Sequence, residues 1–457
     1  MATVYEPQAN GQTNGAWRAV LADATPGRVV AWRDGQPVTA QVFLADVDAL
    51  AARLPPGSAA VNLCEDRYAF LVAFAALLAR GQTNLLPPSR AAQAVDAALA
   101  AHPGSYAVGD VALDPAPPHY LRFAPVAHAT ATVPVPQVAD GALAAIGYTS
   151  GSTGVPHPNA KHWGRLALSS AHNDALFRRL AGGDYCVLAT VPPQHMYGLE
   201  MSVLLPLFGR VSVHSGRPLF AADIERALRE LPAPRVLVTT PVHLRALVAA
   251  AQPLPPLAAI VSSTAPLAPD LARAAEVRFG APVQEVFGST ETCVIAHRRS
   301  AHVEAWTPYP GVALHPQPDG TRVEAPQLAQ AVVLADVVEL QGDGRFRLRG
   351  RNMDLLEIAG KRASLGDLTR KLLAVPGVRD GVVFQLDTAD AMGVRRIAAL
   401  AVAPASMAAD IRAALRAAID PVFLPRPLVC VDALPRSETG KLPKAALLAL
   451  LQPRTSE

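Results

Sequence analysis

The sequence is poor in the features that mark disulfide scaffolds, membrane proteins and disordered chains. It has 4 cysteines in 457 residues, without metal-ligand spacing, so we expect neither a disulfide framework nor a cysteine-based metal site. Its longest uninterrupted apolar run, residues 69–79, is too short to span a membrane. Hydrophobic residues make up 51% of the chain and charged residues 17%, which excludes extended disorder and indicates a large core.

Strong charge of one sign and targeting signals are also lacking. The 41 basic and 38 acidic side chains give a net charge of +3, too even to indicate nucleic-acid binding. The first residues have neither a basic start nor an apolar signal core, so we expect a cytoplasmic protein. The 12 histidines show no paired spacing typical of zinc sites.

The most informative feature present is a loop of hydroxyls and glycines. Residues 148–156 read Tyr-Thr-Ser-Gly-Ser-Thr-Gly-Val-Pro and directly follow the apolar run 142–146. Glycines let the backbone approach an anion closely, while N–H groups and hydroxyls supply donors. No Gly-Lys-Ser/Thr closes the loop, so it is not a Walker P-loop. The loop predicts phosphate binding, with ATP as the first ligand to consider; a flexible linker is the alternative.

Apolar segments alternate with helical stretches through most of the first 350 residues, as at 59–63 followed by 67–80 and at 235–239 followed by 242–251. This rhythm predicts an α/β fold whose mostly parallel sheets are flanked by helices, with ligands at the carboxyl ends of strands. Because 457 residues exceed the usual size of one core, two or more domains are expected. We place a large N-terminal domain at residues 1–350 and a small α+β C-terminal domain at 351–457.

Further segments follow the loop in a fixed order. They are Pro-Pro-Gln-His-Met-Tyr-Gly-Leu at 192–199, Ser-Ser-Thr-Ala-Pro-Leu at 262–267, Val-Phe-Gly-Ser-Thr-Glu at 286–291, Asp336, Gly350-Arg351, Gly-Lys-Arg at 360–362 and Leu-Pro-Arg-Ser-Glu-Thr-Gly-Lys at 434–441. Together they resemble the motifs of the adenylate-forming superfamily, which includes acyl-CoA synthetases, aryl-CoA ligases, luciferases and nonribosomal adenylation domains. The resemblance covers nearly the whole chain. It implies an acid–thiol ligase that uses ATP and Mg²⁺ and has a mobile C-terminal lid.

The resemblance also implies roles for individual residues. Lys441 matches the catalytic lysine, whose ammonium reaches both the carboxylate of the acid and the α-phosphate. Thr290 is expected to bind the α-phosphate, and Glu291 to act in catalysis and to place Mg²⁺. The remaining candidates for ATP binding are Thr149, Ser150, Gly151, Ser152, Thr153, Gly154, Ser263, Thr264, Ala265, Pro266, Phe287, Gly288, Asp336 and Arg351. The candidates for the acid pocket are His195, Tyr197, Gly198, Leu199, Thr240 and Ser262.

The residue types alone leave simpler readings open. Phe287 is also typical of a core aromatic, His195 of a satisfied core histidine, and Arg351 of a surface ion pair. The chain departs from the family after the loop's proline, where His-Pro-Asn-Ala-Lys at 157–161 replaces the usual Lys-Gly. Lys161 is therefore a candidate to contact phosphate from a displaced position.

A finer resemblance concerns the substrate. Residues 62–68, the Pro-His-Pro at 156–158 with Lys161 and Trp163, and residues 359–365 resemble compact bacterial ligases of aryl-polyene and xanthomonadin-type pigment pathways. This implies a hydroxybenzoate-like aromatic acid and transfer to the phosphopantetheine thiol of a separate acyl carrier protein. A free-standing aryl- or acyl-CoA ligase, with coenzyme A as acceptor, is the first alternative. A non-catalytic nucleotide-binding scaffold is the second.

Overall fold

The computed structural model describes residues 15–126, 133–150, 156–250, 252–318, 320–351, 355–358, 361–389, 395–436 and 442–451. The chain divides into two units that interleave in sequence. The first unit contains Met1–Val303, Tyr309–Val312 and Ala325–Gln330, and the second contains Glu304–Pro308, Ala313–Glu324 and Ala331–Glu457.

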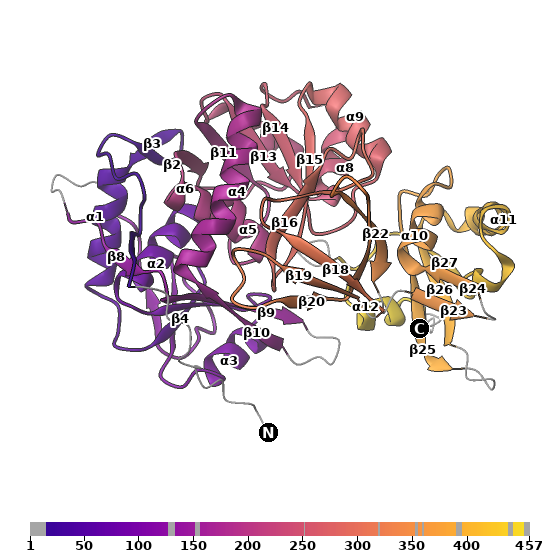
Figure 1. Ribbon diagram of the computed structural model, residues 1–457, viewed down its shortest axis with the longest axis horizontal. Helices are drawn as coiled ribbons and strands as arrows, with labels where there is room; N and C mark the ends of the chain where they lie inside the picture. Colours follow the sequence, from indigo (N-terminus) through magenta and orange to yellow (C-terminus); the bar gives the residue numbers. More distant parts are fainter. Residues whose placement is uncertain are drawn as a thin grey trace. The chain divides into compact units, whose positions relative to one another are not determined.

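Two sheets form the framework of the first unit (Figure 1). The first sheet has the order β10-β9-β5-β4-β6-β7 and is parallel except for β10, which pairs antiparallel with β9. Its strands are β4 (Ala59–Asn62), β5 (Thr83–Leu86), β6 (Tyr106–Gly109), β7 (Tyr120–Arg122), β9 (Leu143–Ser150) and β10 (Pro156–His162). Strands β4, β5 and β6 are buried along their whole length, as expected where helices cover both faces.

The strands of the second sheet that belong to the first unit run in the order β16-β15-β14-β13-β11-β12-β2-β3. The six strands from β15 to β2 are parallel, and β16 and β3 pair antiparallel at either side. The bounds are β2 (Val29–Arg33), β3 (Gln36–Thr39), β11 (Tyr185–Ala189), β12 (Val211–His214), β13 (Arg235–Thr239), β14 (Ala259–Ser262), β15 (Val283–Ser289) and β16 (Cys293–Arg298). A short pair of strands, β1 (Trp17–Ala19) and β8 (Gln137–Ala139), lies apart from both sheets.

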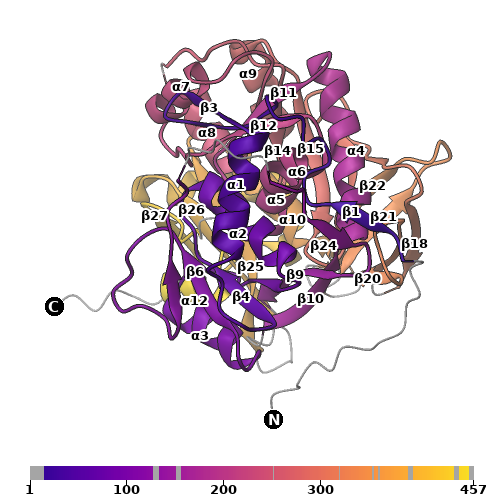
Figure 2. The same cartoon turned by 90° about the vertical axis from the view of Figure 1, so that its left-hand side faces the viewer.

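Helices fill the space between the sheets and cover their outer faces (Figure 2). Helix α2 contacts β4 and β5 of the first sheet and β12 of the second. It is apolar on every side, which is typical of a helix buried between two layers. The helices of this unit are α1 (Ala40–Ala51), α2 (Arg67–Ala79), α3 (Ala92–Ala100), α4 (Trp163–Ala181), α5 (Met196–Leu199), the π-helix η1 (Glu200–Leu204), α6 (Leu205–Phe208), α7 (Ala221–Arg229), α8 (Pro241–Ala249) and α9 (Pro269–Phe279).

The predicted α/β fold class is confirmed, and one difference bears on the site. Strand β9 continues to Ser150, well past the predicted end of the apolar run, and β10 pairs back against it with Ser150 opposite Pro156. The connection between the two strands is therefore residues 151–155, which lie outside the described residues. A run of Pro, His, Asn and Lys has low strand propensity, so pairing with β9 decides the conformation of β10.

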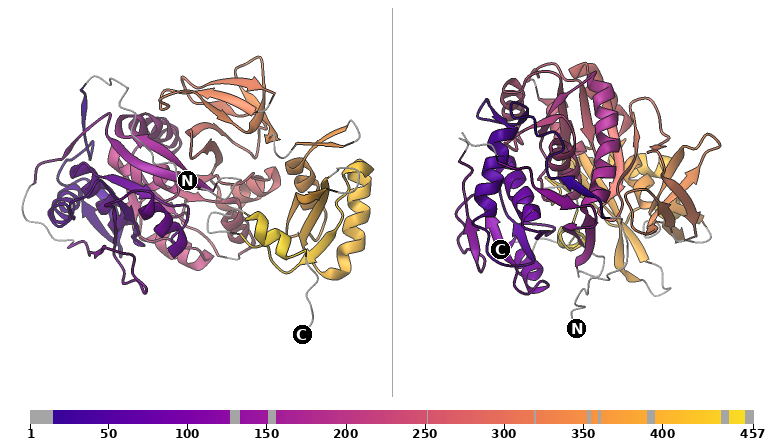
Figure 3. Two further views of the ribbon diagram at one scale, coloured as in Figure 1. Left: turned by 90° about the horizontal axis from the view of Figure 1, so that it is seen from below. Right: turned by 60° about the vertical axis from the view of Figure 1, so that its left-hand side comes forward.

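The second unit consists of small sheets and short helices (Figure 3). Helices α10 and α11 pack on one face of the sheet β25-β26-β27, and α12 packs through Leu447 against residues of its other face. The elements are β17 (Thr307–Pro308), β18 (Ala313–Gln317), β19 (Gly320–Glu324), β20 (Val332–Leu334), β21 (Asp336–Leu340), β22 (Phe346–Arg351), β23 (Leu355–Ile358), β24 (Lys361–Ser364), α10 (Leu365–Leu373), β25 (Asp380–Ala389), β26 (Arg395–Val402), η3 (Ala405–Met407), α11 (Ala408–Ala418), η4 (Pro421–Phe423), β27 (Leu428–Val431) and α12 (Lys444–Ala449).

Two expectations about the whole chain can be compared with the described residues. No described helix combines the length and the apolar character needed to cross a membrane. All four cysteines are free: Cys64, Cys186 and Cys293 are buried, and Cys430 on β27 is half-buried. Burial raises the pKa of the Cys293 thiol to about 12, so this residue is unsuited to act as a nucleophile.

Candidate active site

The carboxyl ends of the parallel strands in the second sheet bring several predicted segments to one edge. Thr239 at the end of β13 lies opposite Ser262 at the end of β14, and β15 ends in the Phe-Gly-Ser-Thr-Glu segment. Ligands of open parallel sheets bind at this edge. The geometry therefore gathers the acid, adenine and Thr-Glu segments where the sequence predicts a site.

The turn region between β15 and β16 carries Thr290 and Glu291; we define it as residues 289–294, from the last residue of β15 to the second residue of β16. A Cβ added to Gly147 on β9 would lie 3.0 Å from Cγ2 of Thr290. The turn of the second sheet thus packs on the strand of the first sheet that leads into the hydroxyl loop. A side chain at position 147 would be tight against Thr290 and would require the Thr290 side chain to shift. Gly147 directly precedes the hydroxyl segment, so Thr290 lies against the strand that leads into it, although the two residues are 143 positions apart in the sequence (290 − 147).

Lys161 forms a hydrogen bond with the backbone of this turn. Its Nζ donates to the backbone carbonyl of Glu291 at 2.9 Å, and the residue is 7% exposed. The ammonium is therefore buried under the turn, which differs from the displaced phosphate contact that the sequence suggests for Lys161.

The segment expected to receive adenine follows β14. Ser263 Oγ donates to the carbonyl of Val286 at 2.9 Å, which ties it to β15. Thr264 has a positive φ of 77°, and its Oγ1 is buried without a hydrogen-bond partner among the described residues. A strained backbone and an unsatisfied hydroxyl at the carboxyl end of a strand fit a site for a polar ligand such as a nucleotide. Ala265 and Pro266 continue this segment, and Pro266 is exposed.

Phe287 and Gly288 lie next to that segment on β15. Phe287 is half-buried, as a residue needs to be to offer a ring face to a base. The pairing of β15 with β16 shifts register between Phe287 and Gly288. A Cβ on Gly288 would lie 2.1 Å from the carbonyl oxygen of Cys293, so the two strands approach too closely there for any side chain.

The described residues place limits on the site for Mg²⁺. Glu291 is half-exposed, and no described group of three His, Cys, Asp or Glu side chains could hold a metal ion together. Mg²⁺ is commonly bound by one or two carboxylates together with nucleotide phosphates and water, and a single carboxylate at Glu291 is compatible with that mode.

In the acid segment, His195 precedes α5 and accepts the Leu199 N–H at 2.7 Å through its backbone carbonyl. The Tyr197 hydroxyl lies 3.2 Å from the carbonyl of Thr239 and 3.0 Å from that of Val261, so its single hydrogen is already engaged. Gly198 packs against the carbonyl of Pro192, and Leu199 is buried in the main core cluster. Their role as pocket walls stays a prediction.

Buried Arg67 on α2 holds the strand that leads into the acid segment. Its guanidinium donates to the carbonyls of Ala189 and Val191 at 2.9 and 2.8 Å, and it also contacts the Ser202 hydroxyl. Burial lowers the pKa of Arg67 to about 9. Sequence reasoning assigned Arg67 to a helix without a role, because nothing local indicates which distant carbonyls it meets.

A polar cluster that sequence reasoning missed lies beside Thr240 and Ser262. Thr190 Oγ1 is 3.1 Å from Thr239 Oγ1 and 2.9 Å from His243 Nδ1. Burial, with a smaller effect of the nearby Arg217 charge, lowers the pKa of His243 and favours the neutral ring. Thr240 caps α8, and Ser262 Oγ is buried with no partner among the described residues. The sequence signal was the hydroxyl-rich Thr-Thr-Pro at the end of a strand.

The remaining predicted residues belong to the second unit or lie outside the described residues. Asp336 and Arg351 face each other across the antiparallel pair β21–β22, and the Asp336 carbonyl accepts from Thr321 Oγ1 at 2.6 Å. Thr149 and Ser150 end β9, but their side chains are not among those described. Gly151, Ser152, Thr153, Gly154 and Lys441 all lie outside the described residues.

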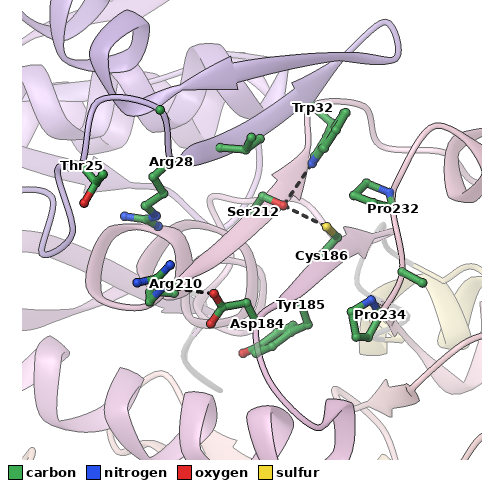
Figure 4. Close-up of a pocket in the computed structure, with 13 residues that line it drawn as sticks. Thr25, Arg28, Trp32, Asp184, Tyr185, Cys186, Arg210, Ser212, Pro232 and Pro234 are labelled. Atoms are coloured by element: carbon green, nitrogen blue, oxygen red, sulfur yellow. Dashed lines mark hydrogen bonds and ion pairs between the residues drawn. The ribbon is translucent and has the colours of Figure 1, made fainter.

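A cavity of about 460 Å³ at the opposite edge of the second sheet is separate from these residues (Figure 4). It lies at the amino ends of β11, β12 and β13, where Arg210 pairs with Asp184 at 3.0 Å. Ser212 Oγ accepts from the Trp32 indole at 3.1 Å and donates to the Cys186 thiol at 3.0 Å. None of the predicted site residues lines this cavity.

Comparisons with known proteins agree with this geometry. A 4-coumarate–CoA ligase of Rhodobacter capsulatus is 31% identical over 303 residues, covering 64% of this chain and 73% of the relative. A segment of the isonitrile lipopeptide synthase of Streptomyces coeruleorubidus is 37% identical over 129 residues, covering 28% of this chain and 8% of that protein. The o-succinylbenzoate CoA synthetase of Bacillus subtilis, solved with its acyl-adenylate, superimposes with a TM-score of 0.80 at 17% identity and covers 97% of this chain and 100% of its own.

The family model described as AMP-binding enzyme matches residues 19–324. The match confirms the predicted superfamily, the enzyme class of an AMP-forming acid–thiol ligase, and ATP with Mg²⁺ as cofactors. The same Bacillus synthetase has also been solved with ATP and a magnesium ion, and its chain superimposes with a TM-score of 0.76 at 17% identity over 92% of this chain and 96% of its own. The chain belongs to the AMP-binding enzyme family, the adenylate-forming ligases.

Proposed function

We propose that this ligase activates a hydroxybenzoate-like aromatic acid and passes the acyl group to the phosphopantetheine thiol of an acyl carrier protein. In the first step a carboxylate oxygen bonds to the α-phosphorus of ATP, the bond from that phosphorus to the bridging oxygen breaks, and pyrophosphate leaves. In the second step the thiol sulfur bonds to the acyl carbon, AMP leaves and the thiol proton is released.

The observation that carries this proposal is the contact of the Thr290 turn with β9 at Gly147. This contact brings the turn that carries Thr290 and Glu291 against the strand that leads into the hydroxyl loop, at the carboxyl edge of the second sheet. In our proposal Thr290 donates to the α-phosphate, Phe287 stacks on the base, and Ser263 to Pro266 receive the base edge. Mg²⁺, when bound near Glu291, neutralises phosphate charge.

Lys441 is proposed as the catalytic residue because two anions must meet in the first step. A lysine ammonium carries a point charge on a flexible stem and can stabilise the charge that develops between them. We place it on a mobile lid formed by residues 351–457, with residues 1–350 forming the adenylation domain. In the second unit, Asp336 is proposed to accept from the ribose hydroxyls, with Arg351 opposite it in register.

The acid is proposed to be aromatic and to carry a ring hydroxyl. Ser262 Oγ is buried without a described partner, and Thr190 with His243 adds a polar group at the same strand edge. A long aliphatic chain would leave the Ser262 hydroxyl unsatisfied, which costs roughly 1–3 kcal/mol. Relatives named 4-coumarate–CoA ligase favour an aromatic acid as well.

We therefore expect hydroxybenzoates to turn over about tenfold faster than benzoate, and both faster than long-chain fatty acids. The measurement is acid-dependent ATP–pyrophosphate exchange over a panel of benzoic, hydroxybenzoic, cinnamic and fatty acids. Efficient exchange with a long fatty acid and none with hydroxybenzoates would contradict the proposed acid class while leaving the ligase intact. No exchange with any acid would contradict the activity itself.

The acceptor has two candidates. The resemblance to pigment-pathway ligases favours a carrier protein in the cytoplasm. The two relatives named 4-coumarate–CoA ligase, 31% and 29% identical, favour coenzyme A. The proposed lid offers no means of choosing, because both acceptors present the same phosphopantetheine arm.

At equal concentrations we expect the thioester to form at least several-fold faster on a holo carrier protein than on coenzyme A. The measurement compares both acceptors with one preferred acid, and the unmodified carrier protein serves as the control that lacks a thiol. A faster reaction with coenzyme A would make the second candidate the function.

A further inference from the structure

We propose that Lys161 and Glu200 are positioning residues. Together they hold the turn 289–294 so that Thr290 and Glu291 are placed to bind the phosphates of ATP and the associated Mg²⁺. This inference rests on the proposed roles of those two residues, and neither Lys161 nor Glu200 needs to touch a substrate. The two come from segments on either side of the turn and form its buried support.

Lys161 acts on the first half of the turn. It lies on β10, directly after the hydroxyl loop, and its Nζ donates to the Glu291 carbonyl at 2.9 Å. A hydrogen bond from an ammonium is about twice as strong as one between neutral groups. The bond therefore holds the peptide group between Glu291 and Thr292 in place. Because the residue is 7% exposed, water does not compete well for this bond.

Glu200 acts on the second half of the turn. Its carboxylate accepts the Val294 N–H, with distances of 3.1 and 3.2 Å to its two oxygens. It also accepts from Ser169 Oγ at 2.5 Å and Asn173 Nδ2 at 3.4 Å, both on α4. Glu200 is 1% exposed, so its carboxyl group is committed to this one cluster.

The two charges also act on each other. Burial raises the pKa of Glu200, while the hydrogen bonds from Ser169 and Val294 and the positive charge of Lys161 oppose that rise. A buried carboxylate is costly unless hydrogen bonds and a nearby positive charge stabilise it, and here one of the hydrogen bonds comes from the turn, through the Val294 N–H. Replacing Lys161 and Glu200 by apolar side chains would remove the hydrogen bonds that these two residues make to the turn, so their role is not only to fill the core.

The local backbone singles out Glu200 as well. It begins the π-helix η1, directly after the acid segment that ends at Leu199. Single π-turns within helices are frequently found at functional sites. The network therefore joins β10 behind the hydroxyl loop, the helix behind the acid segment, and the turn of Thr290 and Glu291.

The test uses two variants, Lys161→Met and Glu200→Gln, and one matched control, Asp46→Asn. Asp46 is a buried carboxylate that, like Glu200, accepts from a hydroxyl (Tyr68) and a backbone N–H (Val126), but it lies on α1 away from the turn. We expect each variant to bind Mg-ATP about tenfold more weakly by calorimetry, the range known for residues that orient ligands indirectly. Adenosine affinity should stay at the wild-type value, because the adenine segment is untouched.

A second measurement needs no nucleotide. In the free protein, amide hydrogen exchange of residues 286–294 should be faster in both variants and unchanged in Asp46→Asn. The double variant Lys161→Met/Glu200→Gln leaves no buried charge unpaired, so we expect it to be folded even if a single variant is not, and to lose Mg-ATP affinity no more than additively.

The outcomes separate this inference from the proposed function. The variants could show wild-type ATP–pyrophosphate exchange, wild-type Mg-ATP affinity and wild-type amide hydrogen exchange in the turn. That result would overturn the inference and leave the proposed function standing. Equal losses of adenosine and Mg-ATP affinity would also overturn it, since they would indicate general damage. A wild-type protein that binds Mg-ATP but activates no acid would overturn the proposed function and leave the positioning result readable.

Discussion

Replacing Lys441 by alanine should lower adenylate formation about a thousandfold, as measured by acid-dependent ATP–pyrophosphate exchange. The loss follows from removing a charge that stabilises the transition state between two anions, an effect known to reach this size for single groups in preorganised sites. Transfer of the acyl group from supplied acyl-adenylate to the thiol should stay within several-fold of the wild-type rate. The two half-reactions would then depend on different residues of the lid.

Lys444→Ala is the matched control, since Lys444 is an exposed lysine three residues further on, at the start of α12. It should leave both half-reactions unchanged. Near-normal pyrophosphate exchange in Lys441→Ala would show that the catalytic charge comes from elsewhere. Equal loss in both half-reactions would count against a lid with two working positions.

Gly288→Ala should destabilise the first unit by about 3 kcal/mol, the upper end of the usual cost of overpacking. The added methyl would lie 2.1 Å from the Cys293 carbonyl oxygen and 2.7 Å from Cα of Val294, so β15 and β16 must separate. Thermal unfolding should show a midpoint lower by roughly 5 °C or more. Mg-ATP affinity should fall with it, since the strands that separate carry the Thr290 turn between them.

The matched substitution is Gly27→Ala, because a Cβ at Gly27 meets nothing within 4 Å and its φ is not positive. That variant should unfold at the wild-type midpoint. If Gly288→Ala also unfolded at the wild-type midpoint and bound Mg-ATP normally, the close approach of β15 and β16 would not be needed for the fold or for the site.

Much of the fold could be predicted because local pattern and burial agree. Residues 69–79 are apolar on every side, and the structure buries α2 between two sheets, where such a helix belongs. Strand β10 could not be predicted this way. Its sequence carries two prolines and polar residues, and only its pairing with β9 makes it a strand.

The sequence motifs that make up the candidate site could be predicted, but the contacts between distant residues within it could not. Motif resemblance located Thr290 and Glu291, but no local pattern says that Thr290 packs on Gly147 or that Lys161 reaches the Glu291 carbonyl. For Glu200 a signal existed, because a single acidic residue within an apolar helical stretch is costly to bury unless something distant satisfies it. A residue of this kind predicts that a distant polar partner exists, but the sequence does not indicate which residue it is.

The distribution of cysteines makes this chain a convenient subject for labelling with fluorophores. Cys64, Cys186 and Cys293 are buried in the first unit, whereas Cys430 is half-buried on β27 of the second. A maleimide dye applied to the native protein should therefore react first at Cys430. Without any substitution, the second unit would then carry a single optical reporter, and the movement that we propose for the lid could be tested during turnover in real time.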